Sequence, residues 1–436
     1  MGSGMRAALG WLLAGGGGAP VMPASAAGPS AIAALDRELA AVVEDGRRPL
    51  SGLSVLAIRD GKVVYERQFG LRRVATAEPV TAATLFRIAS ISKMATTLGL
   101  MRLVEEGRLD LDADAGPHLG FPLRNPHFPQ RAVTLRHLLT HTSSLRDDAG
   151  YFWGADTRLA DVFAPGGAMW ASGAGPGGYF SYSNLNWGVI GTLMERVTGE
   201  RFDRLMKRLL LAPLGLRGGY NTAEFTAEEV ANTATLYRKR GTDTETWDPS
   251  GPWIAQADDF GAKPPAAPPG LARYAVGGNG TLFSPTGGLR ISAADLGGIM
   301  LMLMNKGEHE GKRILKPETI ALMFSEQWTH KEGNGDTLRG LYHGWGLGAQ
   351  RFIDTPGRGN RLVQGGGFGA AGHLGEAYGL VSTFAVDLDR RNGLVSLIGG
   401  LGTDPELYPG QYSALVRSEE LILTALYRRA VLGRAD

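Results

Sequence analysis

The sequence predicts an α+β fold, in which an antiparallel sheet flanked by terminal helices carries an inserted, mostly helical lobe. Strand patterns lie towards both ends of the chain, at 53–69 and 346–398, whereas helical patterns fill the region between them. Arg59-Asp60-Gly61-Lys62 joins the first two strands, and an Asp-Gly pair between apolar runs is a hairpin signal. A cleft between two such lobes is the expected position of a functional site.

Changes in composition divide the chain between the two lobes. We assign residues 28–108 and 285–436 to a discontinuous sheet lobe and residues 109–284 to the helical lobe, because loops rich in proline and glycine begin after Leu109. Helices are expected at 30–43, 90–104, 133–142, 185–198, 202–211, 292–305, 317–324 and 412–431. Strands are expected at 53–58, 63–69, 346–352, 361–364, 381–388 and 394–398.

Two long stretches, 147–178 and 247–280, match neither pattern. Loops of this length in a compact domain often form lids or pocket walls. The second stretch is rich in proline, glycine and alanine and could be a disordered linker, but Trp253, Phe260 and Tyr274 favour packing.

Composition excludes several classes of function. The chain of 436 residues has a formal net charge of +2 and no basic tract, which gives nucleic-acid binding no electrostatic support. It has no cysteine, so disulfides, thiolate catalysis and cysteine metal sites are excluded. After the N-terminal leader no segment reaches about 18 uninterrupted apolar residues, so we expect no membrane span in the mature chain.

Residues 1–27 are typical of a leader. Met1–Gly4 is typical of a vector remnant, and an apolar segment interrupted by Gly15–Gly18 follows a natural start at Met5. Ala24-Ser25-Ala26 is a small-x-small cleavage site, which favours a secretory signal peptide over a disordered leader. The expected location is the periplasm or the exterior of the cell, or the cytoplasm if the leader is not processed.

The candidate site is organised around Arg87-Ile88-Ala89-Ser90-Ile91-Ser92-Lys93. In a helix that begins near Ser90, Lys93 lies on the same face about one turn away, so its amine can reach the hydroxyl. The helix N-terminus adds free backbone N–H groups and the positive end of its dipole. A hydroxyl, a base and oxyanion donors are what nucleophilic catalysis requires. The alternative is an N-cap serine followed by a solvated lysine.

Two further motifs complete this site. Tyr182-Ser183-Asn184 precedes the helix expected at 185–198, and Gly372-His373-Leu374-Gly375-Glu376 opens the last strand region. A tyrosine beside a lysine can act as a general base because a nearby cation favours the phenolate. A glycine-rich strand lets an acyl group lie against backbone and supplies an oxyanion N–H. Alternatively, Tyr182 packs in the core and His373 lies at the surface.

Together these motifs resemble those of the serine β-lactamase and penicillin-binding-protein superfamily, nearest its branch of class C β-lactamases, D-alanyl-D-alanine carboxypeptidases and family VIII carboxylesterases. Ser90-x-x-Lys93 matches the first motif, Tyr182-x-Asn184 the second and His373-x-Gly375 the third, in the family's order. The resemblance covers about 53–401 and implies the β-lactamase/DD-peptidase-like fold, with the active site in the cleft between the lobes.

The resemblance also implies a serine hydrolase that works through an acyl-enzyme. Ser90 attacks a carbonyl, and Lys93 and Tyr182 accept its proton and later donate to the leaving group. The backbone N–H groups of Ser90 and Glu376 form the oxyanion hole, and water then releases the acyl group. The implied substrate-binding and oxyanion positions are Asn184, His373, Gly375 and Glu376. No cofactor or metal is implied.

One departure bears on the substrate. His373 stands where a β-lactamase has the lysine that helps to hold the substrate carboxylate, which weakens the case for an efficient β-lactamase. We therefore favour an ester or amide hydrolase of the carboxylesterase or D-amino-acid peptidase type, acting on a small ester, amide, peptide or β-lactam. The alternatives are a true β-lactamase or DD-carboxypeptidase and a non-catalytic sensor that is acylated once.

Aromatic residues on the two long stretches are candidate pocket walls. Aromatic side chains supply large apolar area for a ligand, and a weakly charged histidine anchor suits neutral acyl groups. The alternative is that they pack the core of their own lobe. The candidates are Tyr151, Phe152, Trp153, Trp170 and Trp253.

Two other patterns are set aside. Gly367–Gly372 fits a dinucleotide fingerprint, but glycines follow it where that motif needs a helix. His137 and His141 have a metal-ligand spacing, but no third ligand lies nearby in the sequence, so a structural helix is favoured. The chain has no Gly-x-Ser-x-Gly elbow, which argues against an α/β-hydrolase.

Overall fold

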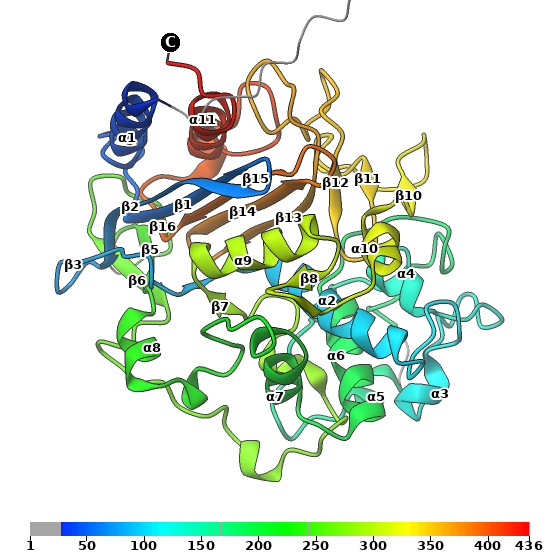
Figure 1. The fold of residues 1–436 in the computed structure, drawn as a ribbon. Helices are drawn as coiled ribbons and strands as arrows, with labels where there is room; N and C mark the ends of the chain where they lie inside the picture. Colours follow the sequence, from blue (N-terminus) through cyan, green and yellow to red (C-terminus); the bar gives the residue numbers. More distant parts are fainter. Residues whose placement is uncertain (1–27, 165–166, 243, 436) are drawn as a thin grey trace, which may run out of the picture.

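The centre of the computed structural model, which describes residues 28–164, 167–242 and 244–435, is a nine-stranded antiparallel sheet (Figure 1). The strand order is β10-β11-β12-β13-β14-β15-β1-β2-β3. The strands are β1 (Gly52–Arg59), β2 (Lys62–Arg73), β3 (Glu78–Pro79), β10 (Trp328–Thr329), β11 (Gly344–Trp345), β12 (Gln350–Phe352), β13 (Ala370–Ala377), β14 (Leu380–Asp387) and β15 (Asn392–Ile398). Leu53 of β1 pairs with Ile398 of β15, so segments from both ends of the chain meet in the middle of the sheet.

Helices cover both faces of this sheet (Figure 1). On one face lie α1 (Pro29–Val43) and α11 (Arg417–Ala425), which continues as a π-helical segment over Leu426–Val431. On the other face lie α2 (Ile91–Glu105) and α9 (Ala293–Met304). Because both faces are covered, every residue of β1 is buried, and the strand reads as an almost continuous apolar run.

The helical lobe and the connections contain shorter elements. The helices are α3 (Gly116–Leu119), α4 (Leu135–Leu139), α5 (Leu159–Phe163), α6 (Leu185–Thr198), α7 (Phe202–Met206) with a π-helical continuation over Lys207–Leu211, α8 (Ala227–Asn232) and α10 (Pro317–Phe324). Three small sheets pair β4 (Phe86–Arg87) with β7 (Arg290–Ile291), β5 (Leu236–Lys239) with β6 (Trp253–Ala257) and β16 (Gly400–Leu401), and β8 (Glu308–His309) with β9 (Lys312–Arg313). α6 packs against α2, which brings the first two motifs together.

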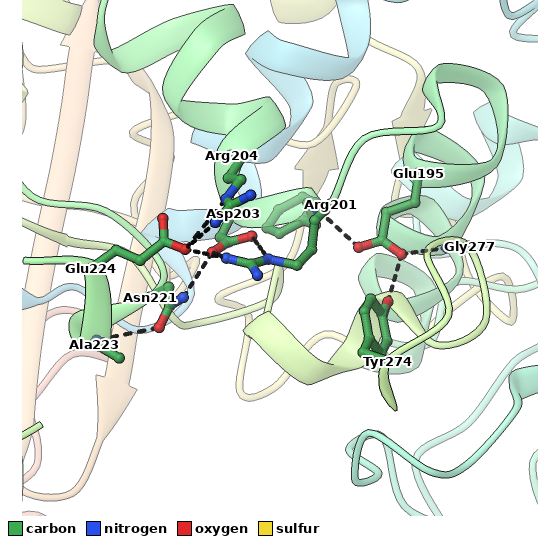
Figure 2. Close-up of polar contacts among 10 residues, drawn as sticks. Glu195, Arg201, Asp203, Arg204, Asn221, Ala223, Glu224, Tyr274 and Gly277 are labelled. Atoms are coloured by element: carbon green, nitrogen blue, oxygen red, sulfur yellow. Dashed lines mark hydrogen bonds and ion pairs between the residues drawn. The ribbon is translucent and has the colours of Figure 1, made fainter. Parts of the chain in front are cut away.

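A buried polar network ties the second long stretch to α6 (Figure 2). Glu195 of α6 accepts hydrogen bonds from Tyr274 Oη at 2.5 Å, Gly277 N at 2.7 Å and Phe202 N at 2.8 Å. Partners of this kind offset the cost of burying a carboxylate. The stretch 247–280 is therefore packed against the lobe, as its aromatic residues favour, and is not a free linker.

The structure has the predicted α+β fold class, and several predicted elements are confirmed. The hairpin at 53–69, the helix at 185–198 and the helix at 317–324 have the expected bounds to within a few residues. The helix predicted at 412–431 is wrong at its start. Tyr412 and Ser413 lie in a loop before α11, and this loop folds back to hydrogen-bond the side chain of Glu420.

Two predicted strands are wrong. No strand forms at 361–364, where Leu362 and Val363 are buried beneath the terminal helices as part of an irregular segment. Their apolar character reflects burial and not strand pairing. The strand predicted at 346–352 is broken by a turn at Gly348, whose φ of +66° suits glycine, so β11 and β12 are separate.

One segment inside the predicted helical lobe pairs with the sheet lobe. Tyr237 of β5 lies in parallel register with Gly400 of β16. The lobe boundaries themselves stay a prediction. The leader predicted over 1–27 lies outside the described residues. Within the part of the chain that the structure describes, every helix is too short or too polar to cross a membrane.

Candidate active site

The first motif lies where a strained turn leads into α2. Ser90 is the N-cap residue of α2, and Ala89 before it has a φ of +45°, a left-handed conformation that costs a non-glycine residue about 1–3 kcal/mol. Ser90 lies half-buried in the wall of a cavity. Gly375 of β13 packs against this turn so closely that a Cβ would lie 2.4 Å from the Ile88 carbonyl oxygen. Only glycine allows the third motif to approach the first.

The amine of Lys93 is fully buried against Ser90. Its Nζ lies 2.8 Å from Ser90 Oγ, 2.8 Å from Asn184 Oδ1 and 3.1 Å from the carbonyl oxygen of Thr286. Burial lowers the pKa of Lys93 well below its usual value, while the charge of Asp147 opposes this. A neutral amine has two N–H donors and one lone pair. Because the Asn184 and Thr286 oxygens can only accept, they take both N–H groups and leave the lone pair for the Ser90 proton.

Tyr182 lies beside Ser90 with its ring held between two others. Its centroid is 4.3 Å from that of His141 and 5.5 Å from that of Tyr342, and Lys93 Nζ lies 4.9 Å from it. The hydroxyl groups of Tyr182 and Ser90 are hydrogen-bonded, and burial raises the pKa of Tyr182 well above its usual value. The prediction that the nearby lysine favours a phenolate is therefore wrong. Burial has the largest effect on the pKa of Tyr182 and favours the phenol, and burial also favours the neutral form of the Lys93 amine.

Asp147 holds the second motif in place, and no sequence pattern singles this residue out. Its carboxylate accepts from Ser183 Oγ at 2.9 Å, Asn184 N at 2.9 Å, Asn184 Nδ2 at 2.8 Å and Leu185 N at 3.0 Å. It therefore bonds the free N–H groups at the start of α6, a role usually taken by the N-cap side chain. Because Nδ2 of Asn184 is committed to Asp147, its Oδ1 turns towards Lys93.

We expect Asp147→Asn to reduce kcat by about tenfold or more, since the new amide cannot accept from all these donors and Asn184 loses its orientation. Removing the carboxylate also removes the charge that opposes the fall in the pKa of Lys93, so the acid limb of the pH–rate profile should move to lower pH. Asp148→Asn is the matched control, because Asp148 is exposed and its ion-pair partner in the described structure is the exposed Arg146. An unmoved limb in Asp147→Asn would contradict the coupling to Lys93.

The third motif reaches the same wall on β13. His373 is almost fully buried, with Nδ1 2.5 Å from the Leu374 carbonyl oxygen, so the alternative of a surface position is wrong. Burial lowers the pKa of His373 to about 3, with a smaller effect from the charge of Lys93, so the ring is neutral at physiological pH. Nδ1–H is the donor to Leu374, which leaves Nε2 as a buried acceptor without a partner among the described residues.

The three motifs line one cavity of about 1170 Å³. β12 pairs with β13 only as far as Gly372, so beyond that point one backbone edge of β13 has no strand neighbour among the described residues. The cavity continues along this edge to Leu341 and to the loop before α11. The residues of the predicted site that line it are Ser90, Tyr182, Asn184, His373, Gly375 and Glu376.

The predicted pocket residues divide into two groups. Tyr151 and Phe152 line the cavity, but Trp153, Trp170 and Trp253 do not, and for these three the prediction is wrong. Trp170 is buried against Phe163, Trp153 packs on the same core, and Trp253 belongs to β6 on a different face of the protein. The aromatic walls that the sequence did not indicate are Trp247, Tyr342 and Tyr378.

This division predicts opposite effects for two aromatic residues of the same stretch. Trp170 is 5% exposed, and Trp170→Ala should lower the free energy of unfolding by about 3–5 kcal/mol while leaving the preference for acyl chain length unchanged. Phe152 is 58% exposed at the cavity, and Phe152→Ala should leave the melting temperature nearly unchanged and raise KM for long acyl esters. Thermal unfolding and a chain-length series measure both. A shift in chain preference in Trp170→Ala alone would reverse the assignment.

The two histidines with metal-ligand spacing have structural positions. His137 Nδ1 accepts from the Thr134 backbone N–H at the start of α4, whereas His141 lies beyond the end of that helix and accepts from Ser183 N at 3.0 Å. The glycine-rich segment 367–372 leads directly into β13 and not into a helix, so it lacks the geometry of a dinucleotide site.

Four features together define a serine hydrolase of the acyl-enzyme type. They are a half-buried serine, a buried lysine on the next turn, a tyrosine hydrogen-bonded to the serine, and a strand whose glycine allows it to pack closely against the serine turn. The chain belongs to the Beta-lactamase family, whose model matches residues 35–415. It is 27% identical to Protein Rv1367c of Mycobacterium tuberculosis H37Rv over 361 residues, which are 76% of this chain and 81% of that protein. It is 34% identical to Esterase EstB of Burkholderia gladioli over 196 residues, 41% of this chain and 49% of that protein. A similar solved structure is that of EstCE1, described as a hydrolase with promiscuous acyltransferase activity, at 23% identity and a TM-score of 0.64 over 91% of this chain and 99% of that one.

Proposed function

We propose that this protein hydrolyses small esters or amides through an acyl-enzyme on Ser90. The observation that carries the proposal is the placement of Lys93, whose Nζ lies 2.8 Å from Ser90 Oγ while two acceptors take its N–H groups. A neutral amine with its lone pair towards a hydroxyl is an activated nucleophile pair.

Each step uses a group in the cavity wall. The Ser90 hydroxyl passes its proton to Lys93 Nζ as Oγ bonds to the substrate carbonyl carbon. The negative charge that develops on the carbonyl oxygen is bound by the backbone N–H groups of Ser90 and Glu376. The protonated amine, through the hydroxyl of Tyr182, returns the proton to the leaving group. Water then attacks the acyl carbon by the reverse route and frees Ser90.

The neutral third-motif histidine favours ester and amide substrates. Because His373 carries no charge at physiological pH, it cannot pair with a substrate carboxylate as a lysine would. The similarity to an esterase is consistent with this preference. The alternatives are β-lactam hydrolysis and D-alanyl-D-alanine carboxypeptidase activity, since Ser90, Lys93 and Tyr182 would serve all of these reactions.

Turnover of three substrates in parallel tests the proposal. p-Nitrophenyl butyrate, a D-alanyl-D-alanine peptide and nitrocefin report esterase, carboxypeptidase and β-lactamase activity. We expect the highest kcat/KM for the ester. A kcat/KM for nitrocefin that exceeds that for the ester by more than tenfold would make β-lactam hydrolysis the better assignment.

A sensor that is acylated once is a candidate of another class. Its chemistry would stop at the acyl-enzyme, so intact-mass measurement after exposure to a β-lactam separates the two. A permanent adduct without any ester turnover would favour the sensor, whereas repeated turnover supports the enzyme.

We further propose that the protein acts in the periplasm or outside the cell. The support is the signal-peptide pattern in the leader, with its small-x-small sequence at Ala24-Ser25-Ala26. N-terminal sequencing of the protein after expression in a Gram-negative host tests this, and an uncleaved leader in the cytoplasmic fraction would contradict it.

A further inference from the structure

One wall of the cavity holds two arginines that face each other. β4 pairs with β7 so that Arg87, three residues before the nucleophile, lies directly opposite Arg290. Like charges directly opposite on paired strands are destabilising. Only 18% of the Arg87 side chain and 8% of the Arg290 side chain are exposed, so water screens this repulsion weakly.

A single carboxylate lies between the two guanidinium groups. Asp258 accepts from Arg290 Nη2 at 2.7 Å and from Arg290 Nε at 3.0 Å, which is a bidentate pair. Arg87 Nε is 3.8 Å from the same carboxylate, too far for a hydrogen bond, and is buried without a hydrogen-bond partner in the described structure. Burial, and after it the charge of Arg290, lowers the pKa of Arg87 to about 10, which Asp258 only partly opposes. In the described structure this cluster therefore holds two cations and one anion, an excess of one positive charge.

This excess charge borders the cavity that contains Ser90. Arg87 lines the cavity with two tyrosines, Tyr151 and Tyr378, which are 43% and 44% exposed. The guanidinium carbon of Arg87 lies 5.2 Å from the Tyr378 ring centroid, and the two side chains are hydrogen-bonded. A guanidinium group beside two phenol hydroxyls whose O–H groups can donate is a donor set suited to a carboxylate.

Two other acidic residues of the site, Asp147 and Glu376, are directed elsewhere. Asp147 is committed to the start of α6 through four hydrogen bonds. Glu376 lies near Tyr342. Burial is the larger cause of the raised pKa of Tyr342, and the charge of Glu376 adds to it. Neither is hydrogen-bonded or ion-paired to Arg87 among the described residues.

We propose that Arg87, together with Tyr151 and Tyr378, forms a subsite for a carboxylate carried by the substrate. The proposal rests on the proposed function and narrows it to esters or amides of molecules that also bear an acid group. It places the recognition of that group on the β4 wall of the cavity and not at His373. The weak charge of the third motif therefore does not exclude acidic substrates.

Two matched pairs of esters test this, one for each side of the scissile bond. On the acyl side, the 4-nitrophenyl monoester of adipic acid is compared with 4-nitrophenyl hexanoate, and on the leaving-group side, 3-carboxyphenyl hexanoate with phenyl hexanoate. For at least one pair we expect the wild type to have the lower KM for the acid, and Arg87→Gln to raise that KM about tenfold or more. The kcat for the acid ester, and both kcat and KM for the neutral esters, should change by no more than a few-fold. The lost contact stabilises the bound acid substrate and its transition state equally, so its loss raises KM and not kcat.

Three variants separate recognition from structure and from general electrostatics. Arg339→Gln removes an exposed arginine from the same cavity and should leave the preference for the acid intact. Arg87→Lys keeps the charge and should retain part of the preference. Tyr378→Phe removes only the hydroxyl of an exposed side chain, so it tests the subsite even if Arg87→Gln unfolds, and it should reduce the preference several-fold.

The outcomes distinguish this subsite from the proposed function. If the wild type hydrolyses the neutral esters but the ratio of acid to neutral kcat/KM is the same in all variants, the subsite is overturned and the hydrolase stands. If Arg339→Gln removes the preference as fully as Arg87→Gln, net charge explains it and the subsite is again overturned. If no ester of either pair is hydrolysed, the proposed function itself fails.

Discussion

Ser90→Ala is expected to lower kcat/KM for p-nitrophenyl butyrate by about four to six orders of magnitude. The Ser90 hydroxyl is the only protein group in the proposed mechanism that bonds to the substrate carbon, so without it no acyl-enzyme forms. The residual rate would come from binding and from the oxyanion N–H groups. Because Ser90 is half-buried at the N-cap and its side chain makes no capping hydrogen bond, removal of Oγ should change the melting temperature little.

Ser92→Ala is the matched control on the same helix. Ser92 is fully buried and its Oγ accepts from Leu289 N at 3.1 Å, so its loss should cost about 1–3 kcal/mol of stability and change kcat/KM by no more than a few-fold. Intact-mass measurement adds a second readout, since Ser90→Ala should acquire no acyl adduct from a quenched ester reaction. Near-wild-type hydrolysis by Ser90→Ala would remove Ser90 as the nucleophile.

The first motif could be predicted from the sequence because its geometry is local. A serine and a lysine three residues apart at a helix start must lie close together, whatever the rest of the fold does. The same holds for Tyr182 and Asn184, which precede α6. What the sequence could not show is the environment. Burial lowers the pKa of Lys93 and raises that of Tyr182, and burial depends on segments far away in the chain.

The positions that were missed depend on contacts between distant segments. Asp147 begins a turn and looks like any loop aspartate, yet the fold brings it to the start of α6, about forty residues later in the chain. The aromatic residues show the reverse problem. Phe152 and Trp170 share one stretch and similar chemistry, and only the fold decides that the first faces the cavity and the second faces the core.

The glycine-rich third motif shows why residue type and position must be read together. Three glycines close to one another suggested a nucleotide loop as well as a strand. The pattern alone argued against the nucleotide loop only because Gly372, Gly375 and Gly379, which are poor helix formers, stand where that loop needs a helix. In the structure, β13 needs Gly375 for contact with the turn before Ser90. The approach of two backbones cannot be derived from either segment alone.

Lys93→Met is expected to lower kcat/KM by about 10²–10⁴-fold, since the variant keeps the volume of the side chain but has no base to take the proton of Ser90. The melting temperature should stay close to that of the wild type. The buried amine carries a cost of its own, because burial lowers the pKa of Lys93. At pH values between the folded pKa and the ordinary one, the unfolded chain binds more protons, so this group destabilises the fold, and the penalty shrinks as pH rises. Methionine cannot ionise, so Lys93→Met removes this pH-dependent penalty.

The pH–rate profile decides whether Lys93 acts as the base. In the wild type the activity should rise with pH as the amine loses its proton, and because the pKa of Lys93 is lowered, this rise should be complete well below pH 10.5, the usual pKa of a lysine. Lys93→Arg provides the control, since its guanidinium keeps a positive charge beside Ser90 and cannot act as a base. It should be as inactive as Lys93→Met and show no such rise. An unchanged acid limb in either variant would show that another group, with Tyr182 the first to test, takes the proton.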